Sequence, residues 1–211
     1  KDISDIEGVR ENYLIGYGLV VGLNGTGDSI SSMAFTEESL IGMLERLGVN
    51  TRDGKIKTKN VAAVMVTGSL PAFARQGTRI DVSISALGDA KSLQGGVLLV
   101  TPMLGADGEV YAIAQGQVAI AGFSAQGDAQ SVVKGVPTSG RIANGGIIER
   151  EILFDFANQK NIKLALRNPD FTTAARIADA INSYLGVLAA KTIDSGTVAL
   201  DLATAGRDDL I

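Results

Sequence analysis

The chain has 211 residues, 45% of them hydrophobic and 20% charged, which is enough for one large or two ordinary globular domains. Its formal net charge is -4 and it has no long basic stretch to follow a phosphate backbone, so we expect no nucleic acid partner. It contains no run of about 18 apolar residues free of charges and turn signals, which excludes a membrane-spanning helix. His and Cys are both absent, so imidazole bases, thiolate nucleophiles and zinc ligands are missing. We therefore expect no enzyme, no metal ion and no cofactor.

The first residue and the glycine content add two expectations. The chain begins with Lys1 and not with Met, and no basic segment with an apolar core leads it, so we expect that an export signal or similar piece has been removed. Glycine accounts for 26 residues, whereas aromatic residues make up 5% and Trp is absent. This composition predicts short strands joined by tight turns.

The first part of the chain favours an antiparallel sheet with one helix. Residues 12–23 are apolar with interspersed glycines and predict a strand that ends in the turn 24–28. Thr36 as N-cap and leucines at helical spacing predict a helix over 37–47, which Gly48 ends. Apolar runs, alternation and an Asp-Gly turn predict further strands at 61–66, 78–87, 97–104 and 110–120.

The second part predicts a smaller unit. Residues 123–146 are poor in large apolar side chains, which indicates an exposed loop or linker. A β-β-α-β-β pattern follows, with strands at 151–156, 162–166, 191–194 and 197–202 and a helix that begins near Asp170 or Thr172 and ends at Gly186. The predicted fold class is α+β, with a mainly antiparallel domain over 1–140 and a small domain over 147–211.

Three patterns that can mark catalytic sites are weak here. The glycines between 16 and 27 break the dinucleotide-binding spacing, so strand and turn geometry explains them better. Residues 131–134 match the S-x-x-K pattern of penicillin-recognising enzymes, but S-D-N and K-T-G are absent. Several carboxylates are candidates for a glycosidase-type acid and base pair, without any sign of which are neighbours: Asp5, Glu7, Asp28, Glu109, Glu149, Glu151 and Asp155.

Charged residues are better candidates for contacts with a partner. A basic cluster would attract an acidic partner, and solubility explains it equally well; it consists of Arg46, Arg52, Lys55, Lys57 and Lys59. Glu149, Arg150 and nearby Arg141 are expected to form surface ion pairs or a subunit contact.

Longer strings carry a resemblance to a known family. In chain order they are GVR at 8–10, LIGYGLVVGLNGTGD at 14–28, KNVAAVMVT at 59–67, FARQG at 73–77, DAKSL at 89–93, VYAIAQG at 110–116, GRI at 140–142 and IERE at 148–151. With these strings, nearly the whole chain resembles the bacterial flagellar P-ring protein family.

The resemblance implies a structural subunit of the flagellar basal body in the periplasm. Such subunits form the P ring around the rod within the peptidoglycan layer and, with the L ring, serve as a bushing. The implied partners are copies of the chain itself, the rod, the L-ring protein, a P-ring assembly chaperone and peptidoglycan. Family members are longer, so we expect a C-terminal part to be missing. The competing hypothesis is an exported cell-wall enzyme or peptidoglycan-binding module.

Two lysines within the matching strings are the expected polar contact for ring formation around the rod. Lys59 directly precedes the predicted strand at 61–66, and Lys91 lies in a short turn after the strand at 78–87. Both ammonium groups are therefore expected on firmly held backbone. Arg141, Glu149 and Arg150 complete the residues expected to contact the rod or a neighbouring subunit.

Overall fold

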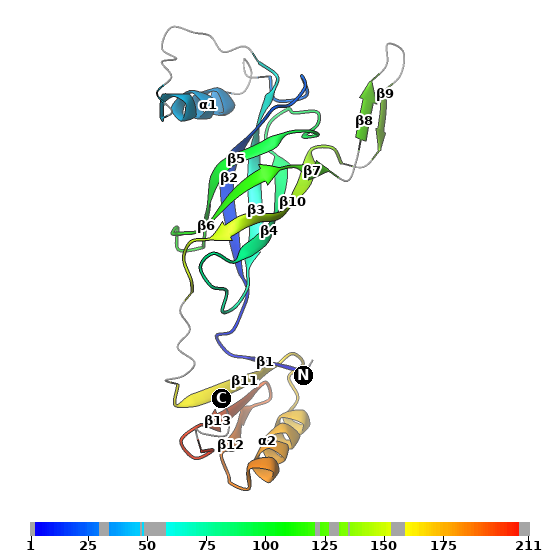
Figure 1. Cartoon of the computed structure of the whole chain (residues 1–211). Coiled ribbons are helices and arrows are strands. Elements are labelled where there is room, and N and C mark those ends of the chain that lie inside the picture. The colour runs from blue at the N-terminus through cyan, green and yellow to red at the C-terminus, as the bar shows by residue number, and fades with distance from the viewer. Residues whose placement is uncertain are drawn as a thin grey trace. The chain divides into compact units, whose positions relative to one another are not determined.

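A computed structural model describes residues 3–29, 34–46, 48, 58–120, 123–126, 131–134, 136–152 and 159–206. The chain divides into two compact units (Figure 1). The barrel unit comprises Glu11–Ile152, and the sheet unit comprises Lys1–Arg10 together with Leu153–Ile211. Neither of the described helices has the length and hydropathy needed to cross a lipid bilayer.

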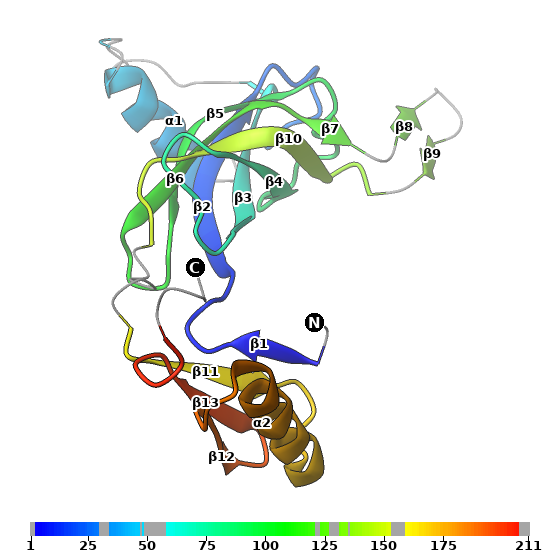
Figure 2. The same ribbon diagram turned by 60° about the horizontal axis from the view of Figure 1, so that its bottom comes forward.

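The barrel unit is built from one antiparallel sheet of seven strands in the order β4-β3-β2-β5-β6-β10-β7. An additional pairing of β4 with β10 closes this sheet on itself (Figure 2). Closure leaves fewer unpaired strand edges than an open sheet has. The strands are β2 (Asn12–Val21), β3 (Val61–Leu70), β4 (Arg79–Ala86), β5 (Val97–Leu104), β6 (Val110–Gln117), β7 (Ala119–Ile120) and β10 (Ser139–Ile148).

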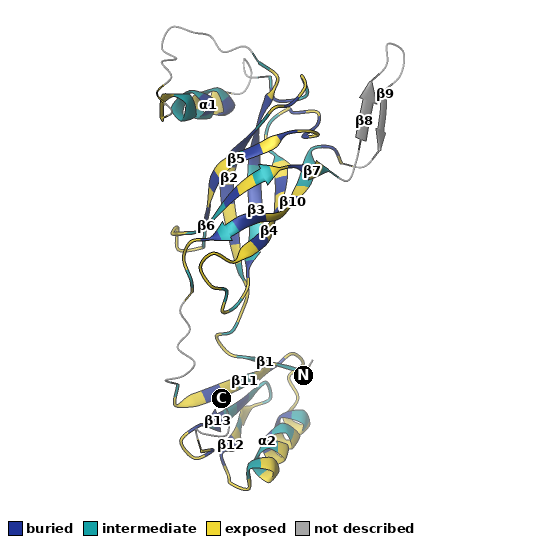
Figure 3. Ribbon diagram, viewed as in Figure 1, coloured by how far each residue is buried: buried dark blue, intermediate teal, exposed yellow. Residues whose placement is uncertain are grey.

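Alternating side chains fill the inside of the barrel. In β4, Ile80, Val82 and Ile84 are buried, and the residues between them are exposed, as the period-2 pattern predicts (Figure 3). Gly16 in β2 permits a close approach, because a Cβ there would lie 2.6 Å from the carbonyl oxygen of Pro102 in β5. The predicted α+β class, mainly antiparallel, is confirmed.

Helix α1 (Ala34–Arg46) packs against the outside of the barrel. Leu40 is buried among Leu19, Val61 and Ala63. The sequence placed Thr36 at the N-cap, whereas it lies inside the first turn, fully buried, and donates a hydrogen bond to Asp28. The Thr36 side chain therefore bonds to Asp28, outside the helix, and does not cap the helix.

The segment expected to be a loop or linker contains strands. β8 (Phe123–Gln126) and β9 (Ser131–Lys134) pair with each other, and β10 begins at Ser139, so the expected boundary between 140 and 147 falls inside β10. The apolar pattern does not predict β10 because three of its residues are glycines. A Cβ would lie 2.7 Å from Val118 at Gly140 and 2.7 Å from Ile80 at Gly146, so the packing of this strand favours glycine there. Backbone pairing forms this strand with little side-chain signature.

The sheet unit has four antiparallel strands in the order β1-β11-β13-β12, with α2 on one face (Figure 2). Its elements are β1 (Ser4–Ile6), β11 (Asn161–Leu166), α2 (Phe171–Leu185), β12 (Ala190–Asp194) and β13 (Thr197–Asp201). The helix begins as predicted: the Asp170 carboxylate accepts from the backbone N–H of Thr173, and Gly186 ends it at φ 70°.

A strand from the N-terminus of the chain joins the β-β-α-β-β unit. β11 pairs with β1, at the N-terminus. Residues 153–156 of the strand expected at 151–156 lie outside the described part. The first ten residues therefore belong with the C-terminal unit.

Candidate partner-binding site

Lys59 and Lys91 flank one turn of the barrel unit. The backbone N–H of Gly27 donates to the carbonyl of Lys59 at 2.6 Å, and the N–H of Lys91 donates to the carbonyl of Thr26 at 2.7 Å. Both lysines are exposed, although the backbone that carries them is bonded to the same two turn residues. We call Thr26, Gly27, Lys59 and Lys91 the lysine turn.

A buried carboxylate holds the lysine turn in place. Asp28 is fully buried, and its oxygens accept hydrogen bonds from Thr36 Oγ1 at 3.0 Å, Ala63 N at 2.8 Å and Ala90 N at 2.9 Å. These donors come from α1, from β3 and from the residue before Lys91. One side chain thus links the three segments around the two lysines.

Asp89 modifies the charge of this region. Its carboxylate accepts from the backbone N–H of Ser29 at 2.7 Å. That bond is the main reason why the pKa of Asp89 lies below its usual value, and the positive charge of Lys59 lowers it further. Asp89 is therefore an anion at neutral pH, and it lies beside the two exposed lysines.

Arg141 lies elsewhere on the barrel. It is paired with Ser83 across β10 and β4, and its guanidinium forms an ion pair with Asp81. A hydrogen bond from the backbone N–H of Asn144, then the bond from Arg141, keeps the pKa of Asp81 below its usual value. A surface pocket of 580 Å³ adjoins this pair, and its lining includes Tyr13, Ser69, Arg79, Asp81, Arg141 and Asn144.

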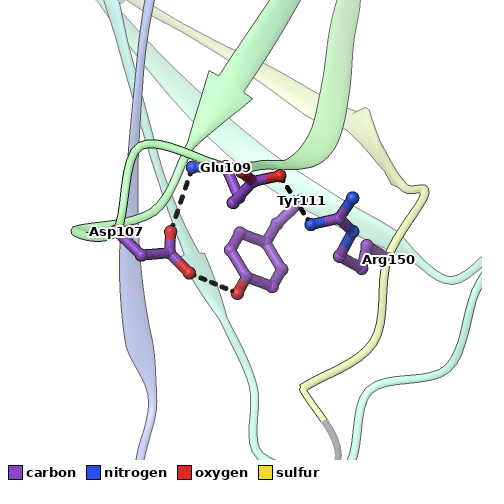
Figure 4. Close-up of polar contacts among 4 residues, drawn as sticks. All are labelled: Asp107, Glu109, Tyr111 and Arg150. Carbon is purple, nitrogen blue, oxygen red and sulfur yellow. Dashed lines mark hydrogen bonds and ion pairs between the residues drawn. The ribbon is translucent and has the colours of Figure 1, made fainter.

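Glu149 and Arg150 follow β10 and are anchored to β6 by backbone hydrogen bonds. Figure 4 shows Arg150 with Glu109, and Tyr111 with Asp107. The carbonyl of Tyr111 accepts from the backbone N–H of Glu149 at 2.8 Å and from that of Arg150 at 3.2 Å. Arg150 donates to Glu109 at 2.7 Å, and the Tyr111 hydroxyl donates to Asp107 at 2.7 Å. This last bond is the chief cause of the lowered pKa of Asp107 and of the raised pKa of Tyr111.

Strand register shows that the predicted residues do not form one site. Val21, at the end of β2, pairs with Val61, two residues after Lys59. Leu104 pairs with Ile15 and with Val110 at the opposite end of the barrel, next to Tyr111. Lys59 and Lys91 thus belong to one end, Glu149 and Arg150 to the other, and Arg141 to a strand between β4 and β7.

The candidate catalytic carboxylates have other partners. Ion pairs bring Asp5 to Arg167, Glu7 to Lys163, Glu109 to Arg150 and Glu151 to Arg75. Asp28 is buried beside the lysine turn, Glu149 is held by its backbone bond to Tyr111, and Asp155 lies outside the described residues. Of the basic cluster, Arg46 is the last residue of α1. Arg52, Lys55 and Lys57 lie outside the described residues.

The sequence did not reveal the structural roles of Asp28 and Asp89. Asp28 was noted only as a candidate acid or base, because an isolated aspartate after a glycine turn has no signature of burial. The only sequence feature that points to burial of Asp28 is its position directly after an apolar strand and a turn. A polar side chain buried there must form hydrogen bonds.

Comparison with known proteins gives a consistent result. Residues 1–211 match the model of a family described as flagellar P-ring protein. A flagellar P-ring protein of Rhodospirillum rubrum is 65% identical over 99% of this chain and 55% of its own length. One from Nitrobacter winogradskyi is 64% identical over 100% of the chain and 56% of its own length, and P-ring protein 1 of Bradyrhizobium diazoefficiens is 67% identical over 96% and 54%. The chain spans about half the length of these relatives, which are named for a ring of the flagellum and not for a reaction.

Proposed function

The chain belongs to the flagellar P-ring protein family, and from this premise we propose that it is a structural subunit of a periplasmic ring that encloses the flagellar rod. In this role it acts with the L ring as a bushing and catalyses no reaction. Its proposed partners are further copies of itself, the rod, the L-ring protein, a P-ring assembly chaperone and peptidoglycan.

The lysine turn is the observation that best supports contact with the rod. Two exposed ammonium groups project from backbone that is bonded to one turn, and the buried Asp28 restrains that turn. Held backbone lowers the entropy lost when a side chain binds. An acidic surface on the rod would be the matching partner.

Repetition around a ring makes a weak contact effective. A single exposed ion pair contributes about 1 kcal/mol or less. When many linked copies present the same pair to one shaft, the small contributions act together. We assign Lys59 and Lys91 to this contact, and Arg141, Glu149 and Arg150 to contacts with a neighbouring subunit or the rod.

Charge reversal in the full-length protein tests this assignment. Lys59→Asp and Lys91→Asp should leave the circular dichroism spectrum and melting temperature nearly unchanged, because both side chains are exposed. We expect fewer P rings in purified basal bodies and less swimming in soft agar. Lys160→Asp, an exposed lysine of the sheet unit, is the matched control. Normal ring counts in both variants, or an equal loss in the control, would contradict the role of the lysine turn.

A further inference from the structure

The C-terminal end of α2 forms a small concave surface. A pocket of 420 Å³ is lined by Asp179, Asn182, Ser183, Gly186, Val187 and Leu188. The side chain of Leu188 is 89% exposed, and Tyr184, on the last turn of the helix, is 90% exposed. A partner seated in this pocket would remove the apolar surface of Leu188 from water.

The chemistry of this pocket suits the side chain of a lysine. Helix C-termini favour nearby cations, but the last turn of α2 has no basic residue. Asp179 adds a carboxylate, and within the described part of the chain it forms no ion pair. Val187 and Leu188 provide an apolar wall for the methylene stem of a lysine.

The pocket is preformed. The side-chain amide of Asn182 donates to the carbonyl of Ala190 at 2.9 Å and accepts from the N–H of Ala190 at 2.7 Å. Gly186 caps the helix by donating its N–H to the carbonyl of Asn182. The loop that carries Leu188 is therefore fixed at both of its ends, which reduces the entropy cost of binding.

A suitable lysine lies on the other face of the same sheet. Val198 and Leu200 face the core beneath α2, so alternation places Ala199 on the open face. The register puts Lys191 on one side of Ala199 and Lys163, which forms an ion pair with Glu7, on the other. Lys191 is exposed and forms no ion pair within the residues that the structure describes. The small side chain of Ala199 leaves room for a helix end to approach.

We propose that the α2 pocket of one copy receives Lys191 from the open sheet face of a second copy. The two surfaces differ and lie on opposite sides of the sheet unit, so the contact is head-to-tail and can repeat from subunit to subunit, as a closed ring requires. This inference rests on the proposed ring function and adds to it a lateral contact that does not involve the lysine turn.

A charge swap in the full-length protein tests the pairing. Asp179→Lys and Lys191→Asp should each lower the number of rings in purified basal bodies by about tenfold, since every contact in the ring is lost together. The double variant should restore the rings, because each copy then offers an exchanged pair. Arg176→Glu, one turn away on the same helix and outside the pocket, is the matched control and should assemble normally.

Chemical cross-linking tests directly whether the two surfaces meet, because correct folding of each subunit does not by itself produce linked subunits. These 211 residues contain no Cys, so Leu188→Cys and Ala199→Cys add two defined thiols to the full-length protein. Joined by a short bismaleimide, they should give a ladder of linked subunits from assembled rings that the full-length protein without these substitutions does not give. In the free full-length protein, the thiol at 188 should react rapidly with maleimide.

Any of four results would overturn the proposal. Rings that assemble normally yet give no ladder, or a double variant that stays defective while folding normally, would exclude this contact but leave the ring function intact. Slow labelling of the thiol at 188 in the free protein would mean that another part of the same chain fills the pocket. Absence of the unaltered protein from basal bodies would remove the proposed function and this inference with it.

Discussion

At the scale of single residues, the buried Asp28 carboxylate organises the end of the barrel that carries Lys59 and Lys91. It accepts three hydrogen bonds, from Thr36, Ala63 and Ala90. A buried carboxyl group is tolerated only where such donors replace water. We infer that Asp28 acts on partner binding through the backbone of the lysine turn and not by contact.

Replacing this carboxylate should be costly. In Asp28→Ala, three donors lose their acceptor in a buried site, and with about 1–3 kcal/mol for each unsatisfied group we expect a loss of about 3 kcal/mol or more in the free energy of unfolding. Urea denaturation followed by circular dichroism measures this loss. Glu38→Ala, at an exposed position of α1, should change it by less than about 0.5 kcal/mol. A similar small change in Asp28→Ala would contradict the role of the carboxylate.

At the scale of elements, Gly27 in the lysine turn and Gly42 in α1 should respond in opposite directions to the same substitution. A Cβ at Gly27 would lie 2.6 Å from the carbonyl oxygen of Lys59 and 2.8 Å from the backbone nitrogen of Val61. Gly42 lies inside α1 with no atom within 4 Å of the corresponding position. The turn therefore depends on glycine, whereas the helix does not.

Alanine at position 27 and alanine at position 42 should change the free energy of unfolding with opposite signs. Gly27→Ala must move the backbone that carries Lys59, and we expect it to lower the free energy of unfolding by about 1–3 kcal/mol. Gly42→Ala should raise it by about 0.5–1 kcal/mol, because alanine has the better helix propensity. Equilibrium unfolding of both variants checks the signs, and equal effects would mean that the turn tolerates a side chain.

The strength of the side-chain pattern decides which elements the sequence predicts. β5, α2 and β13 were predicted to within a residue or so, because each has clear periodicity or clear caps. β10 was missed because its glycines remove the apolar alternation, and β1 was missed because three residues carry too little pattern. The meeting of Lys59 and Lys91 at one turn depends on backbone bonds between distant segments, which no local pattern encodes.

At the scale of the whole molecule, the chain enters the sheet unit, leaves to form the barrel and then returns. β1 pairs along β11, the backbone N–H of Glu7 donates to the carbonyl of Lys163 at 2.8 Å, and Ile6 packs against the core of the sheet unit. The barrel unit has its own hydrophobic core, formed without these ten residues. The stability of the two units should therefore depend differently on the N-terminal segment.

Deleting residues 1–10 should destabilise one unit and spare the other. Loss of β1 uncovers an edge of β11 and removes Ile6 from the core, so amide hydrogens of β11 should exchange faster, whereas those of β5 in the barrel should keep their rates. Asp5→Asn with Glu7→Gln is the matched control, because it removes two exposed ion pairs but keeps the strand pairing and Ile6. That control should exchange nearly as the unaltered chain does, since exposed ion pairs contribute little. Unchanged exchange of β11 after the deletion would show that β1 does not support the sheet unit, and faster exchange of β5 would show that the barrel does not fold independently of it.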